Sequence, residues 1–223
     1  MKIAVVTLGT DNIESYTKFS FDLNERYCKK HGYDFIRYSE VLDENRPVSW
    51  SKLLALKNHL NDYDWLFWID ADAIFHNPLI RIEERIDEQY NFICGKSFGE
   101  GWTPYSTNPD IINMNAGVFL LKGKSPWSIR FINNLYGRTE RIDHMWWENQ
   151  ALMDLMFEKN EYFSDKIKVI DQFLLNGYLE SLYAYYGYCA EQYILHLAGL
   201  PTFDRVEVFG ELHQELIQKH YSG

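Results

Sequence analysis

Apolar residues follow one another without interruption from Trp65 to Ile69. Such a run fits a strand buried on both faces of a parallel sheet better than a half-exposed strand, in which polar and apolar residues would alternate. Residues 2–8, Lys-Ile-Ala-Val-Val-Thr-Leu, are a similar, mostly apolar segment, and Gly9 and Thr10 end it. Both segments are therefore predicted to be buried strands.

The first strand opens a βαβ unit. Apolar residues at a spacing of three to four predict a helix over residues 13–30, and His31-Gly32 is a natural helix end. A second strand is expected over residues 33–38, as in many nucleotide-binding sheets. Neither a G-x-G-x-x-G motif nor a Walker lysine loop follows the first strand, which excludes dinucleotide-binding and P-loop sites.

The rest of the chain alternates between helical and strand patterns. We expect a helix from a cap at Ser49 or Ser51 to about residue 60, and others over residues 80–89, 127–135, 147–157 and 210–220, with strands over 91–96, 118–121 and 167–170. Residues 97–113 are predicted to be a long loop that a ligand orders. Since no composition break divides the chain, we predict a single α/β domain over residues 1–223, with a mostly parallel central sheet flanked by helices.

Asp70 and Asp72 directly follow the apolar run. If the extended backbone persists, the two carboxylates point the same way. They would then lie at the carboxyl end of a central strand, where open α/β sheets bind ligands. Two carboxylates at such a place suit Mn²⁺ or Mg²⁺ and a diphosphate substrate. The alternative is that both are solvated turn residues.

Composition narrows the class of partner. The chain has 223 residues, of which 46% are hydrophobic and 17% aromatic, which excludes a disordered protein. Its formal net charge of −10 argues against a nucleic-acid partner. An acidic protein that handles a phosphorylated substrate needs a cation or a local cluster of bases. The many tyrosines and tryptophans also suit sugar and nucleoside pockets.

The cysteines and the first residues of the chain bear on the cellular compartment. Cys28, Cys94 and Cys189 are widely spaced and form no C-x-x-C, so we expect neither disulfides nor a zinc cluster. The chain opens on a strand without a signal peptide, and no apolar run is long enough to span a membrane. A soluble, cytoplasmic protein is the expectation, and an anchor outside this sequence stays open.

Several short segments, in their order and spacing, resemble the galactosyl/mannosyl/xylosyl transferase family of retaining GT-A glycosyltransferases, known from yeast and plant Golgi enzymes. The resemblance covers roughly residues 48–200. The matching segments are Trp50-Ser51-Lys52, Tyr63-Asp64-Trp65, Asp70-Ala71-Asp72-Ala73, Asn77-Pro78, Asn115-Ala116-Gly117-Val118-Phe119-Leu120, Trp127-Ser128, Glu148-Asn149-Gln150-Ala151-Leu152, Leu175-Asn176-Gly177-Tyr178 and His196-Leu197-Ala198-Gly199.

The resemblance implies a GT-A fold and a role for each matched position. The implied metal ligands are Asp70, Asp72 and His196. The implied nucleotide-sugar contacts are Thr7, Leu8, Lys52, Ala71, Asn115, Gly117 and Gly199. The implied catalytic group, on the sugar face opposite the leaving diphosphate, is Glu148, Asn149 and Gln150.

One departure from the family pattern concerns the leaving group. Plant members carry a lysine near the diphosphate two residues after the glycine of the H-x-x-G segment, and this chain has Pro201 there. Charge stabilisation then falls to the metal, to Lys52 or to another base such as Arg205. Lys52 lies in the first turn of its expected helix, and a solvated lysine is the alternative for it.

Other residues keep structural alternatives. From sequence alone, His196 is by default a hydrogen-bonded core histidine, and the resemblance favours the ligand role. His76 is a less favoured ligand, because Asn77-Pro78 predicts a turn there. Glu148 could be a solvated first-turn residue. Trp146-Trp147 could be core or an acceptor platform. Core and surface packing are expected for most of Tyr178, Tyr183, Tyr185, Tyr186 and Tyr188.

Together these features predict a Mn²⁺- or Mg²⁺-dependent retaining glycosyltransferase. It would move a hexose or pentose from a nucleoside-diphosphate sugar, UDP-hexose first and GDP-mannose second, to a glycan acceptor. Because the amides of Asn149 and Gln150 are poor nucleophiles, same-face attack is favoured over a covalent intermediate. The alternatives are a nucleotide-sugar hydrolase with the same metal site and a non-catalytic nucleotide-sugar or glycan binder.

Overall fold

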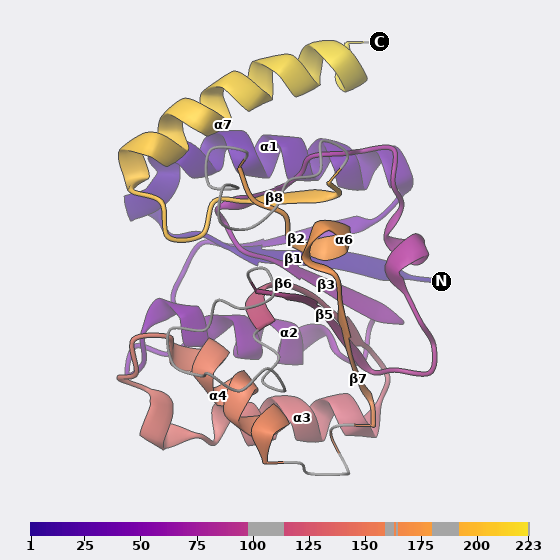
Figure 1. The fold of residues 1–223 in the computed structure, drawn as a ribbon, viewed down its shortest axis with the longest axis vertical. Helices are drawn as coiled ribbons and strands as arrows, with labels where there is room; N and C mark the ends of the chain where they lie inside the picture. The colour runs from indigo at the N-terminus through magenta and orange to yellow at the C-terminus, as the bar shows by residue number, and fades with distance from the viewer. Residues whose placement is uncertain (98–113, 159–162, 164, 180–191, 223) are drawn as a thin grey trace.

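The structure, a computed structural model, describes residues 1–97, 114–158, 163, 165–179 and 192–222 (Figure 1). The strands are β1 (Ile3–Leu8), β2 (Asp34–Tyr38), β3 (Trp65–Ile69), β4 (Ala73–Phe75), β5 (Phe92–Lys96), β6 (Met114–Lys122), β7 (Ile167–Ile170) and β8 (Ile194–His196). The helices are α1 (Glu14–His31), α2 (Ser51–His59), α3 (Pro126–Tyr136), α4 (Trp147–Phe157), α6 (Gln172–Leu175) and α7 (Thr202–Leu216).

The described strands form a six-stranded sheet in the order β2-β1-β3-β6-β5-β7, and β4 pairs with β8 in a second, two-stranded sheet. The pairs β1–β2, β1–β3 and β5–β7 are parallel, whereas β6 runs antiparallel to both β3 and β5. The prediction of a mostly parallel central sheet with flanking helices is confirmed.

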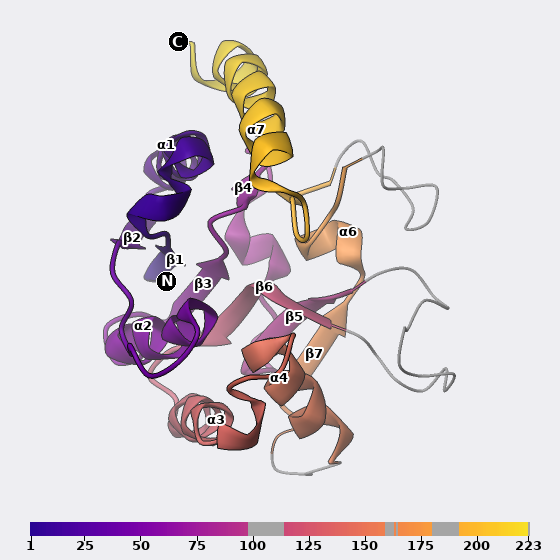
Figure 2. The ribbon, with the colours of Figure 1, turned by 90° about the vertical axis from the view of Figure 1, so that its left-hand side faces the viewer.

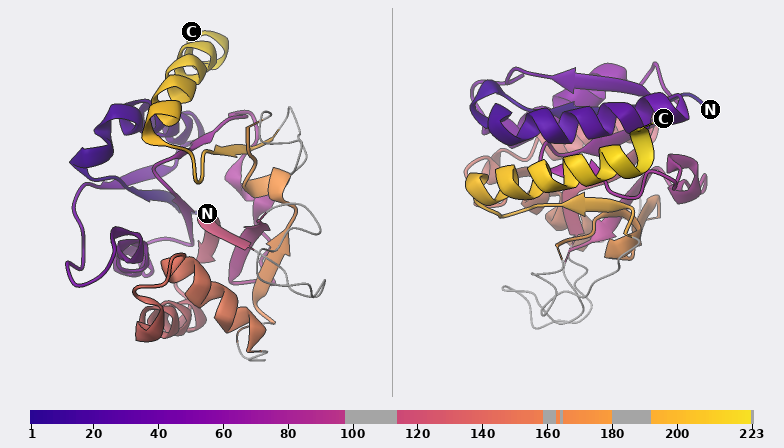
Figure 3. Two further views of the ribbon diagram at one scale, coloured as in Figure 1. Left: turned by 60° about the vertical axis from the view of Figure 1, so that its left-hand side comes forward. Right: turned by 90° about the horizontal axis from the view of Figure 1, so that it is seen from above.

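Helices cover both faces of the large sheet. In Figure 1, α1 and α7 lie on one side and α2, α3 and α4 on the other. Figure 2 and Figure 3 show α7 lying beside α1. Leu66 and Trp68 of β3 pack into the core on the α2–α4 side, and Phe67 and Ile69 pack into the core on the α1 side. The predicted burial of this strand on both faces is confirmed.

Two expected elements differ from the structure. The helix predicted over residues 80–89 is wrong, because only a 3₁₀ turn, Ile82–Arg85, forms there. Ile82 is fully buried, and Arg85 Nε donates to the carbonyl of Leu174 over 2.9 Å, so tertiary contacts fix this segment in place of helical bonds. The last helix begins at Thr202 rather than Gly210, and Ile217–Tyr221 continue it as a π-helix.

The structure also bears on the predicted cap of α2, the long loop, the cysteines and the membrane. No side chain caps α2, since the 3₁₀ turn Val48–Trp50 precedes it directly and the Ser51 hydroxyl accepts from the amide of Leu42 instead. The predicted loop lies, apart from Ser97, outside the described residues. Cys28 and Cys94 are buried free thiols, and Cys189 lies outside the described part. None of the described helices has the length and apolar character needed to cross a membrane.

Candidate active site

Asp70 and Asp72 lie on a tight turn between β3 and β4. The amide of Ala73 donates to the carbonyl of Asp70 over 3.0 Å, so the extended backbone does not persist through the motif. The strand-alternation argument for bringing the two carboxylates together is therefore wrong. Their proximity comes from the turn itself.

Helix α1 holds this turn through two buried side chains. Ser20 Oγ donates to the carbonyl of Ala71 over 2.7 Å. The side-chain Nδ2 of Asn24 donates to the carbonyl of Ala73 over 3.0 Å, and its Oδ1 accepts from the backbone amide of Phe75 over 3.1 Å. The helix thus satisfies backbone groups that the turn and the short strand β4 would otherwise leave unpaired.

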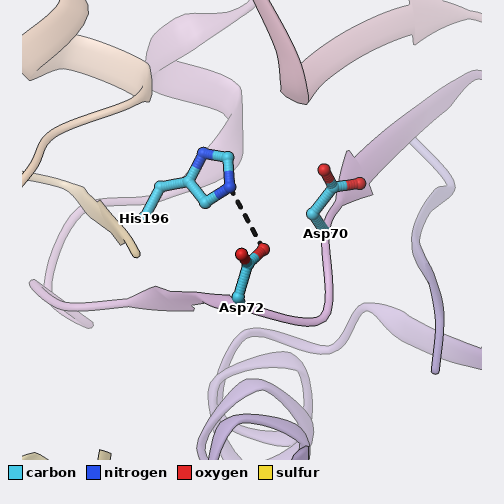
Figure 4. A group of neighbouring side chains, drawn as sticks. All are labelled: Asp70, Asp72 and His196. Carbon is cyan, nitrogen blue, oxygen red and sulfur yellow. Dashed lines mark hydrogen bonds and ion pairs between the residues drawn. The ribbon is translucent and has the colours of Figure 1, made fainter. Parts of the chain in front are cut away.

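His196 reaches the two aspartates from the other end of the chain. It ends β8, and the β4–β8 pairing places it opposite Ala73. Figure 4 shows its ring pointing at the Asp72 carboxylate, with Nε2 3.1 Å from Oδ1. Ligand atoms of Asp70, Asp72 and His196 all lie within 4.8 Å of one another, the geometry of a candidate metal centre.

The hydrogen bonds around His196 favour a cation between its ring and Asp72. The amide nitrogen of Asn176 donates to Tyr178 Oη over 3.2 Å, so its Oδ1 is the acceptor that faces His196 Nδ1 at 2.8 Å. That bond assigns the ring proton to Nδ1 and leaves a lone pair on Nε2. Two acceptors 3.1 Å apart repel unless a proton or a metal ion lies beside both. The donor set therefore fits a divalent cation.

A glycine lets the three ligands approach one another. The amide of Asp70 donates to the carbonyl of Gly117 over 2.7 Å, which fixes the start of the turn against β6. A Cβ at Gly117 would lie 2.2 Å from His196 Cε1 and 3.0 Å from Asp70 Oδ2. Any side chain at this position would push the imidazole away from the carboxylates.

Lys52 forms the centre of a buried charge cluster beside the metal ligands. Its Nζ lies 3.1 Å from Asp70 Oδ1 and 2.7 Å from Glu148 Oε1. It also donates to the carbonyl of Ala116 over 3.0 Å, so all three ammonium protons have a partner. The interpretations of Lys52 and Glu148 as solvated residues are wrong, because both side chains are buried.

The charges of this cluster shift the pKa values of Lys52 and Asp70. Burial opposes protonation of Lys52, but Asp70 and Glu148 raise its pKa well above the usual value. Burial also raises the pKa of Asp70, and the carboxylates of Asp72 and Glu148 add to this effect against the attraction of Lys52. Lys52 and Arg205 face three carboxylates, those of Asp70, Asp72 and Glu148, which leaves a negative charge for another cation to balance.

Arg205 of α7 contacts the other oxygen of Asp72. Its Nη2 lies 2.6 Å from Asp72 Oδ2, and its Nε donates to the carbonyl of Leu197 over 3.2 Å. Burial acts to raise the pKa of Asp72, but His196, when Nε2 carries a proton, and Arg205 together hold it at about 2. Asp72 is therefore an anion at neutral pH, as a metal ligand must be.

The metal-ligand candidates, Lys52 and Glu148 line one cleft with a volume of about 390 Å³, whereas Arg205 does not line it. The predicted site residues that line it are Lys52, Asp70, Asp72, Asn115, Gly117, Glu148, Asn149, His196 and Gly199. The predicted residues outside its lining are Thr7, Leu8, Ala71 and Gln150.

The residues outside the lining differ in their surroundings. The amide nitrogen of Gln150 donates to Asp154 Oδ1 over 2.8 Å, which turns it along the helix. Thr7 is buried at the carboxyl end of β1, and its Oγ1 has no partner among the described residues. His76 follows the end of β4 and is not in the candidate metal cluster. Tyr178 is core, and the other four tyrosines considered lie outside the described residues.

Sequence reasoning assigned no role to two residues of the site. Asn176, fully buried, orients His196, and Trp68 Nε1 donates to Asp70 Oδ1 over 2.6 Å. The position of Trp68, two residues before Asp70 at the end of a strand, was a signal for that contact. The amide of Asn176 gave no comparable local signal, since its partner lies 20 residues away in sequence.

The chain is similar in sequence to known glycosyltransferases. The model of the galactosyl transferase GMA12/MNN10 family matches residues 6–91. Xyloglucan 6-xylosyltransferase 4 of Arabidopsis thaliana is 24% identical over 189 residues, which cover 75% of this chain and 36% of that relative. The chain thus spans well under half the length of the curated relative it matches.

Solved structures show the same fold. A glycosyltransferase involved in the glycosylation of the major capsid of PBCV-1 aligns with a TM-score of 0.70 at 16% identity, covering 95% of this chain and all of that one. Galactosyltransferase LgtC, solved with donor and acceptor sugar analogues, aligns with a TM-score of 0.61 at 13% identity, covering 95% of each chain. The predicted resemblance is confirmed: the chain is similar to the galactosyl transferase GMA12/MNN10 family and has the GT-A glycosyltransferase fold.

Proposed function

We propose that residues 1–223 form one catalytic domain of a metal-dependent retaining glycosyltransferase. It would transfer a hexose or pentose from a nucleoside-diphosphate sugar to a hydroxyl of a glycan acceptor. The observation that carries this proposal is the cluster of Asp70, Asp72 and His196 in a cleft of a GT-A fold, at the carboxyl end of β3. In that place a divalent cation can meet a diphosphate.

Asp70, Asp72 and His196 would hold Mn²⁺ or Mg²⁺. When bound, the ion supplies Lewis-acid stabilisation for the departing diphosphate. UDP-hexose is the first candidate donor and GDP-mannose the second. Thr7, Leu8, Ala71, Asn115, Gly117 and Gly199 keep their proposed place around the nucleotide sugar.

Two cations flank the proposed metal site, and we assign them different tasks. Lys52 has its three donors engaged by Asp70, Glu148 and the Ala116 carbonyl, so it fixes these side chains rather than contacting phosphate. A guanidinium has five N–H donors, and the contacts of Arg205 with Asp72 and Leu197 leave others for phosphate oxygens. Arg205 would then take the role of the lysine that plant members carry at the position of Pro201.

Glu148 and Asn149 would face the donor sugar. Glu148 is buried in the cleft lining, with Oε1 held by Lys52 and with no partner for Oε2 among the described residues. A sugar hydroxyl is a suitable donor to that oxygen. Asn149 Oδ1 accepts from the amide of Ala116 over 2.7 Å, which fixes its amide at the cleft. Gln150 would have to leave Asp154 to support developing positive charge.

The same arrangement favours same-face attack over a covalent intermediate. A covalent route needs a nucleophilic carboxylate beside the anomeric carbon. Glu148 is the carboxylate nearest in sequence to Asn149 and Gln150, and its Oε1 already pairs with Lys52 Nζ at 2.7 Å. The departing diphosphate is then the base that takes the proton of the acceptor hydroxyl.

A panel of UDP- and GDP-sugars tests the proposal. The expected result is release of nucleoside diphosphate that requires Mn²⁺, that acceptor glycans accelerate well above background, and that Asp72→Asn abolishes. Product NMR should show that an α-linked donor gives an α linkage.

Each rival function predicts a different result. A β linkage from an α donor would refute retention. Donor consumption that is indifferent to every acceptor would indicate a nucleotide-sugar hydrolase. Donor binding without any turnover would indicate a non-catalytic binder.

A further inference from the structure

Trp147 and Glu148 are neighbours in sequence but lie in opposite environments. The Glu148 side chain is held inside the protein by Lys52, and the residue is only 6% exposed. Trp147 is 43% exposed, although large aromatic side chains are normally buried. Both residues line the cleft that contains Asp70, Asp72 and His196. An exposed indole therefore forms part of the wall of the candidate active site.

The backbone fixes Trp147 in this position. Its φ of 41° lies in the left-handed region, which non-glycine residues rarely adopt. Its amide donates to the carbonyl of His144 over 2.9 Å, and the next two residues of α4 are fixed by Lys52 and by the Ala116 amide. This left-handed residue directly precedes Glu148, whose carboxylate meets Lys52 inside the protein. The indole is thus held on a rigid element rather than on a free loop.

The chemistry of the cleft is divided between its charged and its apolar parts. Asp70, Asp72 and His196 supply the ionic groups that suit a metal and a diphosphate, whereas Trp147 supplies a flat apolar surface with one N–H donor. Aromatic rings of this kind bind ligands that have both an apolar face and a polar edge. The C–H face of a pyranose ring, surrounded by hydroxyls, has that character.

We propose that Trp147 is a stacking platform for a pyranose ring of the acceptor glycan. The proposal rests on the proposed function, because it takes the charged part of the cleft as the donor site. A nucleobase could stack on the same ring. However, Thr7 and Leu8, which are expected beside the nucleotide, do not line this cleft, so the acceptor is the occupant that the geometry favours.

Two substitutions of Trp147 separate the ring from the backbone. Trp147→Gly removes the indole and also relieves the left-handed conformation, so the melting temperature should stay the same or rise. Trp147→Phe keeps an aromatic face. Phe203→Ala is the matched control, since Phe203 is 76% exposed and does not line the cleft.

The binding experiment uses lactose, cellobiose and xylobiose as probes. Saturation-transfer NMR is recorded with UDP or GDP and Mn²⁺ present, and calorimetry measures the affinity for the nucleotide alone. At least one probe should bind the native protein through its C–H face. Trp147→Gly should weaken that binding about tenfold or more, Trp147→Phe less than about threefold, and Phe203→Ala not at all, with nucleotide affinity unchanged throughout.

Three binding results would overturn the proposal that Trp147 is a stacking platform. They are equal probe binding by the native protein and Trp147→Gly, loss of nucleotide affinity in Trp147→Gly, and a native protein that binds nucleotide with Mn²⁺ but no probe. A fall in the melting temperature of Trp147→Gly would assign the ring a packing role and also overturn it. Failure of the native protein to bind either nucleotide would instead contradict the proposed function.

Discussion

Two groups of buried polar residues meet at the turn between β3 and β4, and they differ in how completely they are paired. On the α1 side, Ser20 and Asn24 bond only to backbone groups of the turn and of β4. On the α2–α4 side, Lys52 holds Asp70 and Glu148, and the cluster keeps excess negative charge and an unpaired Glu148 oxygen among the described residues. The polar groups of the first set are paired within the protein, whereas the second set has the unbalanced charge and the unpaired oxygen typical of a ligand-binding site.

The difference indicates how the fold divides two tasks. Neutral hydrogen bonds to the backbone fix the position of the turn, and they need no partner from solution. Charged groups that repel one another cost stability in the free protein and become favourable when a cation or a substrate binds. Substitutions on the two sides should therefore affect different observables.

The largest loss of stability is expected for Lys52→Met. This change leaves the carboxylates of Asp70 and Glu148 buried without their shared cation, which typically costs about 3 to 5 kcal/mol. Urea unfolding of the metal-free protein measures the loss. Lys52→Met combined with Glu148→Gln should recover part of it, because one buried charge is removed. A loss below about 1 kcal/mol would contradict the cluster as described.

A smaller loss is expected for Asn24→Ala on the other side of the turn. The substitution removes the two hydrogen bonds that the Asn24 side chain makes with the carbonyl of Ala73 and the amide of Phe75, which contribute about 0.5 to 1.5 kcal/mol each. Ser20→Ala, which removes a single hydrogen bond, is the matched control and should cost less. Folded Asn24→Ala protein should retain Mn²⁺ affinity within about tenfold, less than the loss of about 10- to 100-fold typical for partners of a ligand side chain, because Asn24 bonds only to the backbone of Ala73 and Phe75. Complete loss of metal binding in folded protein would remove the distinction between the two groups.

The smallest effect is expected where α7 meets α1. Partial burial acts to raise the pKa of Asp22, but hydrogen bonds from Arg26 and from His213 of α7 lower it on balance. A lowered carboxyl pKa contributes stability above the unfolded value of about 3.9 and loses it as the pH falls through the folded value. The pair is partly exposed, so Asp22→Asn should cost less than about 1 kcal/mol at pH 7. The difference from the native protein should vanish well below pH 4, and a difference that persists there would assign it to packing.

The sequence predicted the elements that depend on local pattern and missed those fixed by distant contacts. The apolar run of β3 and the spacing of α1 were sufficient, because burial on both faces and a helical stripe are visible in a short window. Residues 80–89 have a charged helical pattern, but burial of Ile82 and the bond from Arg85 to Leu174 override it. Propensity is a weak guide where tertiary contacts are this strong.

The candidate site shows the same division. The Asp70–Asp72 pair could be recognised locally, although the argument from an extended strand was wrong. The burial of Lys52 also had a local signal, since it lies four residues before Leu56 on the core side of α2. Its partner Glu148 lies 96 positions further along the chain, and no pattern in the sequence alone specifies that contact.

The central claim is that Asp70, Asp72 and His196 hold a divalent cation through which a nucleoside diphosphate binds. Calorimetric titration of UDP and of GDP, with Mn²⁺ and after chelation, tests it most directly on the native protein and Asp72→Asn. The account predicts that the native protein binds one of the two nucleotides only with Mn²⁺. Asp72→Asn should lose about a hundredfold or more of that affinity, because loss of a mere outer-shell partner already costs about 10- to 100-fold. Binding of equal strength in chelator, or in folded Asp72→Asn with Mn²⁺, would contradict the account.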